Sequence, residues 1–115
     1  MIHENFTTVW LEAWNSHNLD AIMAHYADDV SFYSPVAAEL SPEGKGHISG
    51  KEALREYFSM ALQKYPGLCF TLHKALKGVD SVVLYYTSIR HLKSAECMIF
   101  DREGKVREVY AHYAP

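Results

Sequence analysis

Residues 26–35 read YADDVSFYSP, and this stretch indicates where the chain changes from helices to sheet. Helical apolar spacing continues up to Tyr26, whereas residues 30–33 form a short apolar run of the kind found in strands. Pro35 cannot donate a backbone hydrogen bond to a sheet ladder, so it should end the strand. We therefore expect a helix that closes at Ala27–Asp29 and a strand over residues 30–33.

Two helices are expected before this strand. Apolar residues at positions 6, 9, 10, 13 and 14 follow the spacing of one face of an amphipathic helix, which should end near Asn15–Asn18. The same spacing returns at positions 19, 22, 23 and 26, directly after those polar residues. The two helices should therefore form a tight pair.

Residues 35–50, PVAAELSPEGKGHISG, contain two prolines and three glycines without a sustained period. A loop of this length is usually reserved for function, and it could form a lid over a pocket. Ser49 and Glu52 then match a capping box. Apolar residues at positions 54, 57, 58, 61 and 62 predict a third helix, which Pro66–Gly67 should end.

Four strands are expected in the second half of the chain, because the apolar period changes there to two. Short polar or glycine-containing segments separate the strands, which cover residues 68–77, 81–91, 95–101 and 105–113. The order of elements is then α-α-β-α-β-β-β-β in a single α+β domain over residues 1–115. A long curved antiparallel sheet with helices over one face leaves a hollow between the two layers.

Charge and hydropathy exclude several classes of partner. The net charge is −3 and no Lys/Arg cluster occurs, so we expect no nucleic-acid partner. The N-terminal MIHENFTTVW lacks the basic and apolar regions of a signal peptide. The longest apolar run, residues 82–86, is far too short to span a membrane. We therefore expect a cytoplasmic protein without membrane contacts.

The cysteines and histidines do not predict a metal site. Cys69 and Cys97 are the only cysteines, and neither belongs to a CxxC or Cys/His ligand pattern, so both are expected to be reduced thiols of the core. The seven histidines do not occur at the spacings of paired metal ligands. Phosphate-loop and dinucleotide fingerprints are missing from the sequence, so no bound cofactor is expected.

Five short motifs follow one another along the chain: NLDAI at 18–22, YADD at 26–29, Ser34-Pro35 after the strand, GKE at 50–52 and FDREG at 100–104. In this order they resemble the SnoaL-like domains of the nuclear transport factor 2-like superfamily, nearest to the ketosteroid isomerase pattern. The resemblance covers nearly the whole chain. It implies a cone-shaped α+β fold in which three helices pack on a strongly curved, mostly antiparallel sheet and enclose a pocket for a small apolar molecule.

The resemblance also assigns positions to the residues of the isomerase site. Ser34 stands where the family has its general base, an aspartate. Trp10 stands at the tyrosine that donates to the oxyanion, and Glu96 at the aspartic acid that stays protonated beside it. Tyr26 retains a supporting tyrosine, and Ala111 stands at the acid/base aspartate of the related polyketide cyclases. A serine hydroxyl cannot abstract a carbon-bound proton near neutral pH without an activating base, so steroid isomerisation is not expected.

Glu96 is the strongest candidate for acid/base chemistry, because it lies mid-strand where every second side chain should be buried. Two registers of the last hairpin stay open. A four-residue loop over 101–104 places Glu96 opposite Val109 with Arg107 on the diagonal, and the resemblance favours this register. A three-residue loop with a glycine bulge gives Glu96 other neighbours: Glu108, Tyr110 and His112.

The pKa of Glu96 depends on its neighbours. Pairing with Arg107 lowers this pKa, whereas aromatic enclosure without the arginine raises it and makes Glu96 a hydrogen-bond donor or general acid. We predict Glu96 and Tyr26 as catalytic residues. Tyr26 as a core aromatic and Ser34 as the cap of a turn are the simpler alternatives. The predicted pocket lining consists of Trp10, Trp14, Ser34, Phe58, Met98, Val109 and Tyr113.

Three functions are compatible with the sequence. The first is an enzyme of the isomerase, cyclase, dehydratase or epoxide hydrolase type that acts on a small apolar molecule through Glu96, with Tyr26 or Trp10 as donor. The second is a non-catalytic binder of such a molecule. The third is a protein-association module, because the superfamily commonly dimerises through the outer face of its sheet. The candidate contacts of such a homodimer are Tyr85, Ile89 and Tyr110.

Overall fold

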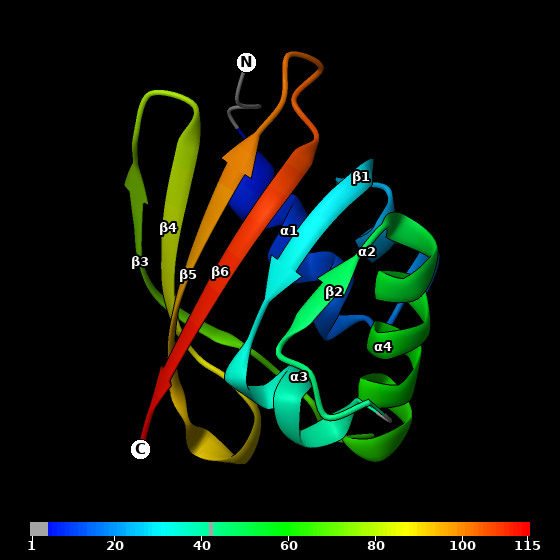
Figure 1. Ribbon diagram of the computed structural model, residues 1–115. Coiled ribbons are helices and arrows are strands. Elements are labelled where there is room, and N and C mark those ends of the chain that lie inside the picture. The colour runs from blue at the N-terminus through cyan, green and yellow to red at the C-terminus, as the bar shows by residue number, and fades with distance from the viewer. Residues whose placement is uncertain (1–4, 42) are drawn as a thin grey trace.

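The computed structural model describes residues 5–41 and 43–115. Its helices are α1 (Phe6–Asn15), α2 (Leu19–Met23), α3 (Pro35–Leu40) and α4 (Lys51–Lys64), with a short 3-10 helix η1 (Ile89–His91). Its strands are β1 (Tyr26–Tyr33), β2 (His47–Ser49), β3 (Thr71–Lys77), β4 (Ser81–Thr87), β5 (Lys93–Phe100) and β6 (Val106–Ala114). They form one sheet in the order β2-β1-β6-β5-β4-β3, in which β1 and β6 run parallel and the other neighbours antiparallel (Figure 1).

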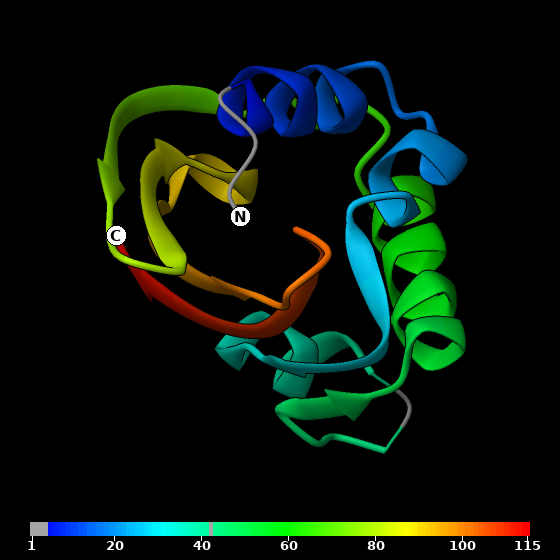
Figure 2. The same cartoon turned by 90° about the horizontal axis from the view of Figure 1, so that it is seen from above.

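The sheet curls around a core that the helices complete. Seen from above, β3 to β6 curve along one side, β1 and α4 lie on the opposite side, and α1 joins the two sides (Figure 2). Every second residue of β5, from Ser94 to Phe100, is buried on the inner face, while the alternate residues are half-buried. The predicted α+β class, with helices packed against a mostly antiparallel sheet, is confirmed.

The apolar faces of α1 and α4 fill this core, as their spacing predicts. Asn18 begins α2 directly after α1, because its side chain accepts a hydrogen bond from the backbone N–H of Ala21 at 3.1 Å. Pro66 and Gly67 follow the end of α4. The buried residues of α1 and α4 are Phe6, Trp10, Ala13, Trp14, Leu54, Tyr57, Phe58 and Ala61.

β1 begins at Tyr26, earlier than the sequence predicts. α2 ends at Met23, so the expected helix closing at Ala27–Asp29 is wrong. Tyr26 pairs with Val106, because β1 lies inside the sheet between β2 and β6. The sheet hydrogen bonds and the burial of the Tyr26 ring therefore outweigh the helical spacing that reaches this residue.

The expected loop over residues 35–50 contains two further elements. α3 begins at Pro35, whose fixed φ suits the first position of a helix. β2 pairs with the end of β1 and extends the edge of the sheet. The expected capping box is wrong, since Gly50 precedes α4 with φ of 93° and no side-chain cap forms in this described segment.

The last hairpin adopts neither of the two expected registers. Glu96 lies opposite Ala111 instead of Val109, so the favoured register is wrong by two residues while the same face stays toward the core. A register shift beside the turn leaves Arg107 between the paired positions of β6. The Arg107 side chain is exposed and forms an ion pair with Glu108, so it does not pair with Glu96.

Cys69 and Cys97 are both free thiols. Cys69 is exposed because it lies between α4 and β3, and the expectation of a buried core thiol is wrong there. Cys97 is half-buried on the outer face of β5. Across the described part of the chain, the helices are too short or too polar to cross a membrane.

Candidate functional site

A narrow cavity lies between the inner face of the sheet and the helices. Its volume is about 40 Å³, which is room for a few water molecules. Most of the side chains around it are apolar or aromatic. They are Trp10, Trp14, Phe32, Val36, Leu40, Tyr57, Phe58, Ala61, Leu68, Phe70, Tyr86, Ser88, Ile89, Glu96 and Tyr113.

Glu96 is the carboxylic acid of this lining, and only 4% of the residue is exposed. The Tyr86 hydroxyl donates a hydrogen bond to Glu96 Oε1 at 2.5 Å. The ion pairs among residues 5–41 and 43–115 involve other carboxylates, so no cation compensates its charge. Burial therefore raises the pKa of Glu96 to about 7, although the hydrogen bond from Tyr86 opposes the rise.

Tyrosine hydroxyls surround this carboxyl. Burial and then the charge of Glu96 raise the pKa values of Tyr86 and Tyr26 far above the ordinary range. The same two causes raise the pKa of Tyr113 to about 12. These tyrosines stay protonated near neutral pH, so they are hydrogen-bond donors and not bases.

Trp10 donates its indole N–H to the Tyr26 hydroxyl at 3.1 Å. An indole has a single donor, so Trp10 cannot also donate to a ligand in the way that the resemblance implies. The Tyr26 oxygen accepts this bond and keeps its own proton for another acceptor. Tyr26 lies behind Phe58, with ring centroids 5.6 Å apart, and is not among the lining residues.

Two buried donors, Trp14 Nε1 and Ser94 Oγ, have no hydrogen-bond partner within the described residues. Trp14 lines the cavity. Ser94 lies between Tyr86 and Tyr113 on the neighbouring strands. Buried polar groups are normally paired, so water or a bound molecule is the expected partner of these donors.

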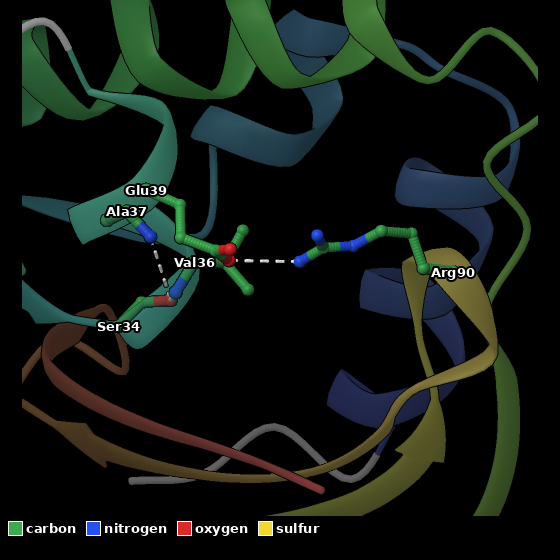
Figure 3. Close-up of polar contacts among 5 residues, drawn as sticks. All are labelled: Ser34, Val36, Ala37, Glu39 and Arg90. Carbon is green, nitrogen blue, oxygen red and sulfur yellow. Dashed lines mark hydrogen bonds and ion pairs between the residues drawn. The ribbon is translucent and has the colours of Figure 1, made fainter. Parts of the chain in front are cut away.

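Ser34 ends β1 and begins α3. Its hydroxyl oxygen accepts hydrogen bonds from the backbone N–H groups of Val36 and Ala37, at 3.1 and 3.3 Å (Figure 3). Ser34 is therefore a cap, but of the helix α3 and not of a turn as the alternative role had it, and caps of this kind stabilise a protein by about 1 kcal/mol. Ser34 does not line the cavity, but the helix that it begins places Val36 and Leu40 there.

An ion pair joins α3 to η1 beside the cavity. The Arg90 guanidinium lies 3.0 Å from the Glu39 carboxylate, and the two side chains extend toward each other from the two elements (Figure 3). Arg90 and His91 have φ angles of 54° and 58°, in the left-handed region that few non-glycine residues adopt. Leu40, next to Glu39, and Ile89, next to Arg90, line the cavity. The Glu39–Arg90 ion pair therefore holds together two segments of the cavity wall.

The cavity brings together part of the predicted site: Trp10, Trp14, Phe58, Glu96 and Tyr113. Tyr26, Ser34, Met98 and Val109 are buried outside its lining. Sequence reasoning missed Tyr86, the hydrogen-bond partner of Glu96. Its parity with Val82 and Leu84 signals an inner-face position, but alternation cannot show that its hydroxyl reaches a carboxyl on the adjacent strand.

The arrangement suits a small and mostly apolar molecule with one polar atom. Aromatic rings enclose the space: Trp14 meets Phe58 at a centroid distance of 4.7 Å, and Phe70 meets Tyr86 at 4.8 Å. Glu96 can donate or accept a proton near neutral pH. Within the described residues, His, Cys, Asp and Glu side chains do not gather in groups that could hold a metal ion.

The fold places the chain in a class, the proteins with a nuclear transport factor 2-like, ketosteroid isomerase-like fold. Within that class, the chain belongs to the SnoaL-like domain family, whose pattern matches residues 8–113. A comparison with curated proteins found no significant match.

Three solved structures illustrate the similarity. A SnoaL-like protein of unknown function from Burkholderia thailandensis is 37% identical, with a TM-score of 0.92 over 97% of this chain and 93% of that one. A candidate isomerase of the SnoaL-like family from Agrobacterium tumefaciens is 16% identical, with a TM-score of 0.75 over 98% and 97%. A hypothetical protein with this fold from Catenulispora acidiphila, in complex with trimethylamine, is 16% identical, with a TM-score of 0.73 over 99% and 88%.

Proposed function

We propose that the cavity binds a small, mostly apolar molecule and that Glu96 exchanges a proton with it, in a reaction of the isomerase, cyclase, dehydratase or epoxide hydrolase type. The observation that carries this proposal is the buried carboxyl itself. Glu96 lines an aromatic cavity, lacks a cationic partner among the described residues and has a pKa of about 7. A pKa near the working pH is the most effective value for a general acid or base.

The residues around Glu96 have different roles. Tyr86 holds Oε1 of Glu96 and leaves Oε2 for the ligand. Tyr26, fixed by the N–H of Trp10, is a positioning residue behind the aromatic wall, with its own proton left to donate. The aromatic rings lower the local dielectric constant, which strengthens each hydrogen bond inside. The complex of a relative with trimethylamine supports a ligand of very small size.

Turnover of small ketones, enones and epoxides tests the enzymatic role of Glu96. Glu96→Gln should lower kcat/KM by about 100- to 10,000-fold, and the wild-type rate should change with an inflection near pH 7. Glu12→Gln, which removes an exposed carboxylate from α1, should leave the rate unchanged. An active Glu96→Gln protein, or a Glu96 pKa at or below the ordinary value by carboxyl NMR, contradicts the proposal.

A second candidate is a binder without catalysis. It is favoured by the position of Ser34, whose hydroxyl caps α3, and by the single carboxyl in the lining. In that case ligand affinity should survive Glu96→Gln and fall on Trp14→Ala, while none of the substrates turns over.

We also propose that a second copy of the chain covers the outer face of the sheet. Tyr85 of β4 is 39% exposed, and Tyr110 of β6 is half-buried beside Tyr33. Ile89 is not part of this surface, because it belongs to η1 and lines the cavity. Light scattering should give the mass of a dimer for the wild type and of a monomer for Tyr85→Glu; a monomeric wild type contradicts the proposal.

A further inference from the structure

Among the described residues, the side chains that face Glu96 are tyrosines and groups without charge. The titratable groups that face it from β4, β6, β1 and α4 are tyrosines, all with raised pKa values: Tyr86, Tyr113, Tyr26 and Tyr57. α1 contributes two indoles, Trp10 and Trp14, which do not titrate. The charged residues of α3 and η1 nearest the cavity, Glu39 and Arg90, neutralise each other at 3.0 Å.

An ionised Glu96 is therefore an uncompensated charge in an apolar enclosure. Isolated buried carboxylates are strongly disfavoured, and a cation at hydrogen-bond distance removes much of that penalty. The chain does not supply the cation from its described residues, and the carboxyl lines the cavity. A ligand can supply it.

The rest of the wall also suits a cation. Aromatic rings attract a positive charge that lies within about 6 Å of their centres, most strongly in a site that excludes water. Trp14, Phe58 and Phe70 form one contiguous group, with Trp14 at 4.7 Å from Phe58 and 5.3 Å from Phe70. Trp10 and Tyr86 extend this group toward Glu96, with ring centroids 5.5 Å apart. One carboxylate and several aromatic rings are the components of an ammonium site.

We propose that the ligand of this cavity is a small organic cation, a protonated tertiary amine of about the size of trimethylammonium. Its N–H donates to the free oxygen of Glu96, and its alkyl groups pack against the rings. The cavity volume of about 40 Å³ restricts the ligand to a few atoms unless the wall moves. This inference rests on the proposed function for the place of binding, and it specifies the chemistry of the polar atom.

The sign of the pH dependence separates this ligand from a neutral one. An ammonium ion binds the ionised carboxyl, so its affinity should increase with pH up to the pKa of Glu96, about 7, and then level off. A neutral ligand that accepts a hydrogen bond from the protonated carboxyl should bind more weakly above that pH. The unpaired donor Trp14 Nε1, which lines the cavity, would also hold such an acceptor.

Calorimetric titration with two probes of similar shape tests the inference. Trimethylammonium chloride carries the charge, and tert-butanol is its neutral counterpart. At constant ionic strength, wild-type protein should bind trimethylammonium about tenfold more tightly at about pH 8 than at about pH 6, and more tightly than tert-butanol at the higher pH. Glu96→Gln should lose at least about tenfold in trimethylammonium affinity at about pH 8 and should lose the pH dependence. Glu12→Gln should behave as the wild type.

Three outcomes overturn the inference and have different meanings for the site. If tert-butanol or a small ketone binds, and Glu96 supports turnover, while trimethylammonium does not bind, the ligand is neutral and the proposed function stands. If neither probe nor any neutral substrate binds to folded protein, the inference and the proposed function fail together. Trimethylammonium binding that does not depend on pH, or that persists in Glu96→Gln, places the cation elsewhere and also overturns the inference.

Discussion

Between about pH 4.5 and pH 8, the wild type should lose about 3 kcal/mol more of its free energy of unfolding than Glu96→Gln. The pKa of Glu96 is about 7 in the folded protein, against an ordinary value of 4.5. Between these two values the unfolded chain releases the proton and the folded protein retains it, so increasing pH favours unfolding. Each pH unit in this interval corresponds to about 1.4 kcal/mol. The stabilisation is complete below the lower pKa and is lost as the pH passes the upper one.

Glutamine is the appropriate replacement because it does not titrate and can still accept the hydrogen bond from Tyr86. Urea unfolding at several pH values gives the free energies, and the difference between the two proteins removes the titration of all other groups. Glu12→Gln should follow the wild type, since Glu12 is exposed. If the free energies of unfolding of wild type and Glu96→Gln change in parallel with pH, the pKa of Glu96 is not raised by folding.

The main helices and the strands of the second half could be predicted because their signals are local, whereas α3, β2 and η1 were not expected. Apolar spacing locates α1 and α4, and the change to a period of two locates the strands. The misassigned region around Tyr26 has a helical pattern, but the residue pairs with Val106 far along the chain. α3 is a different case, because a capping serine and a proline at its first turn are visible in the sequence. The same two residues also follow the end of a strand, and the six residues of α3 are too few to show a helical period.

Alternation along β5 allows Glu96 to be buried, and the register of the hairpin decides its facing and its partners. A two-residue shift in register keeps the face and changes every cross-strand neighbour. The bulge at Arg107 accounts for one of the two residues and the turn for the other, since Phe100 pairs with Val106 and not with Lys105, and turn composition reveals neither. Arg107 consequently forms an ion pair with Glu108 on the outer face of the sheet. Glu96 instead accepts a hydrogen bond from Tyr86. The residues that set the pKa of Glu96 are thus brought to it by contacts between strands, which local sequence patterns do not reveal.

Trp10→Ala should decrease the free energy of unfolding by about 4 kcal/mol. Trp10 is 1% exposed, and its ring packs against Trp14, Phe70 and Tyr86. Truncation removes these contacts, leaves a large void, and deprives the Tyr26 hydroxyl of its donor. Denaturant unfolding monitored by far-UV circular dichroism measures the loss. Val9→Ala is the matched control on the same helix, because Val9 is 44% exposed and its truncation should change stability by less than about 0.5 kcal/mol.

Trp10→Phe separates the hydrogen bond from the ring. It removes the N–H that reaches Tyr26 at 3.1 Å together with part of the ring volume, and Trp14→Phe, which loses the same volume, is the matched control. We expect a loss of about 1–3 kcal/mol, since a buried hydroxyl is left without its donor. Trp14→Phe should be milder, because Trp14 Nε1 has no partner within the described residues. If the two phenylalanine variants were equally stable, the Trp10–Tyr26 bond would contribute nothing measurable, and Tyr26 would lose its role as a positioned donor behind the cavity.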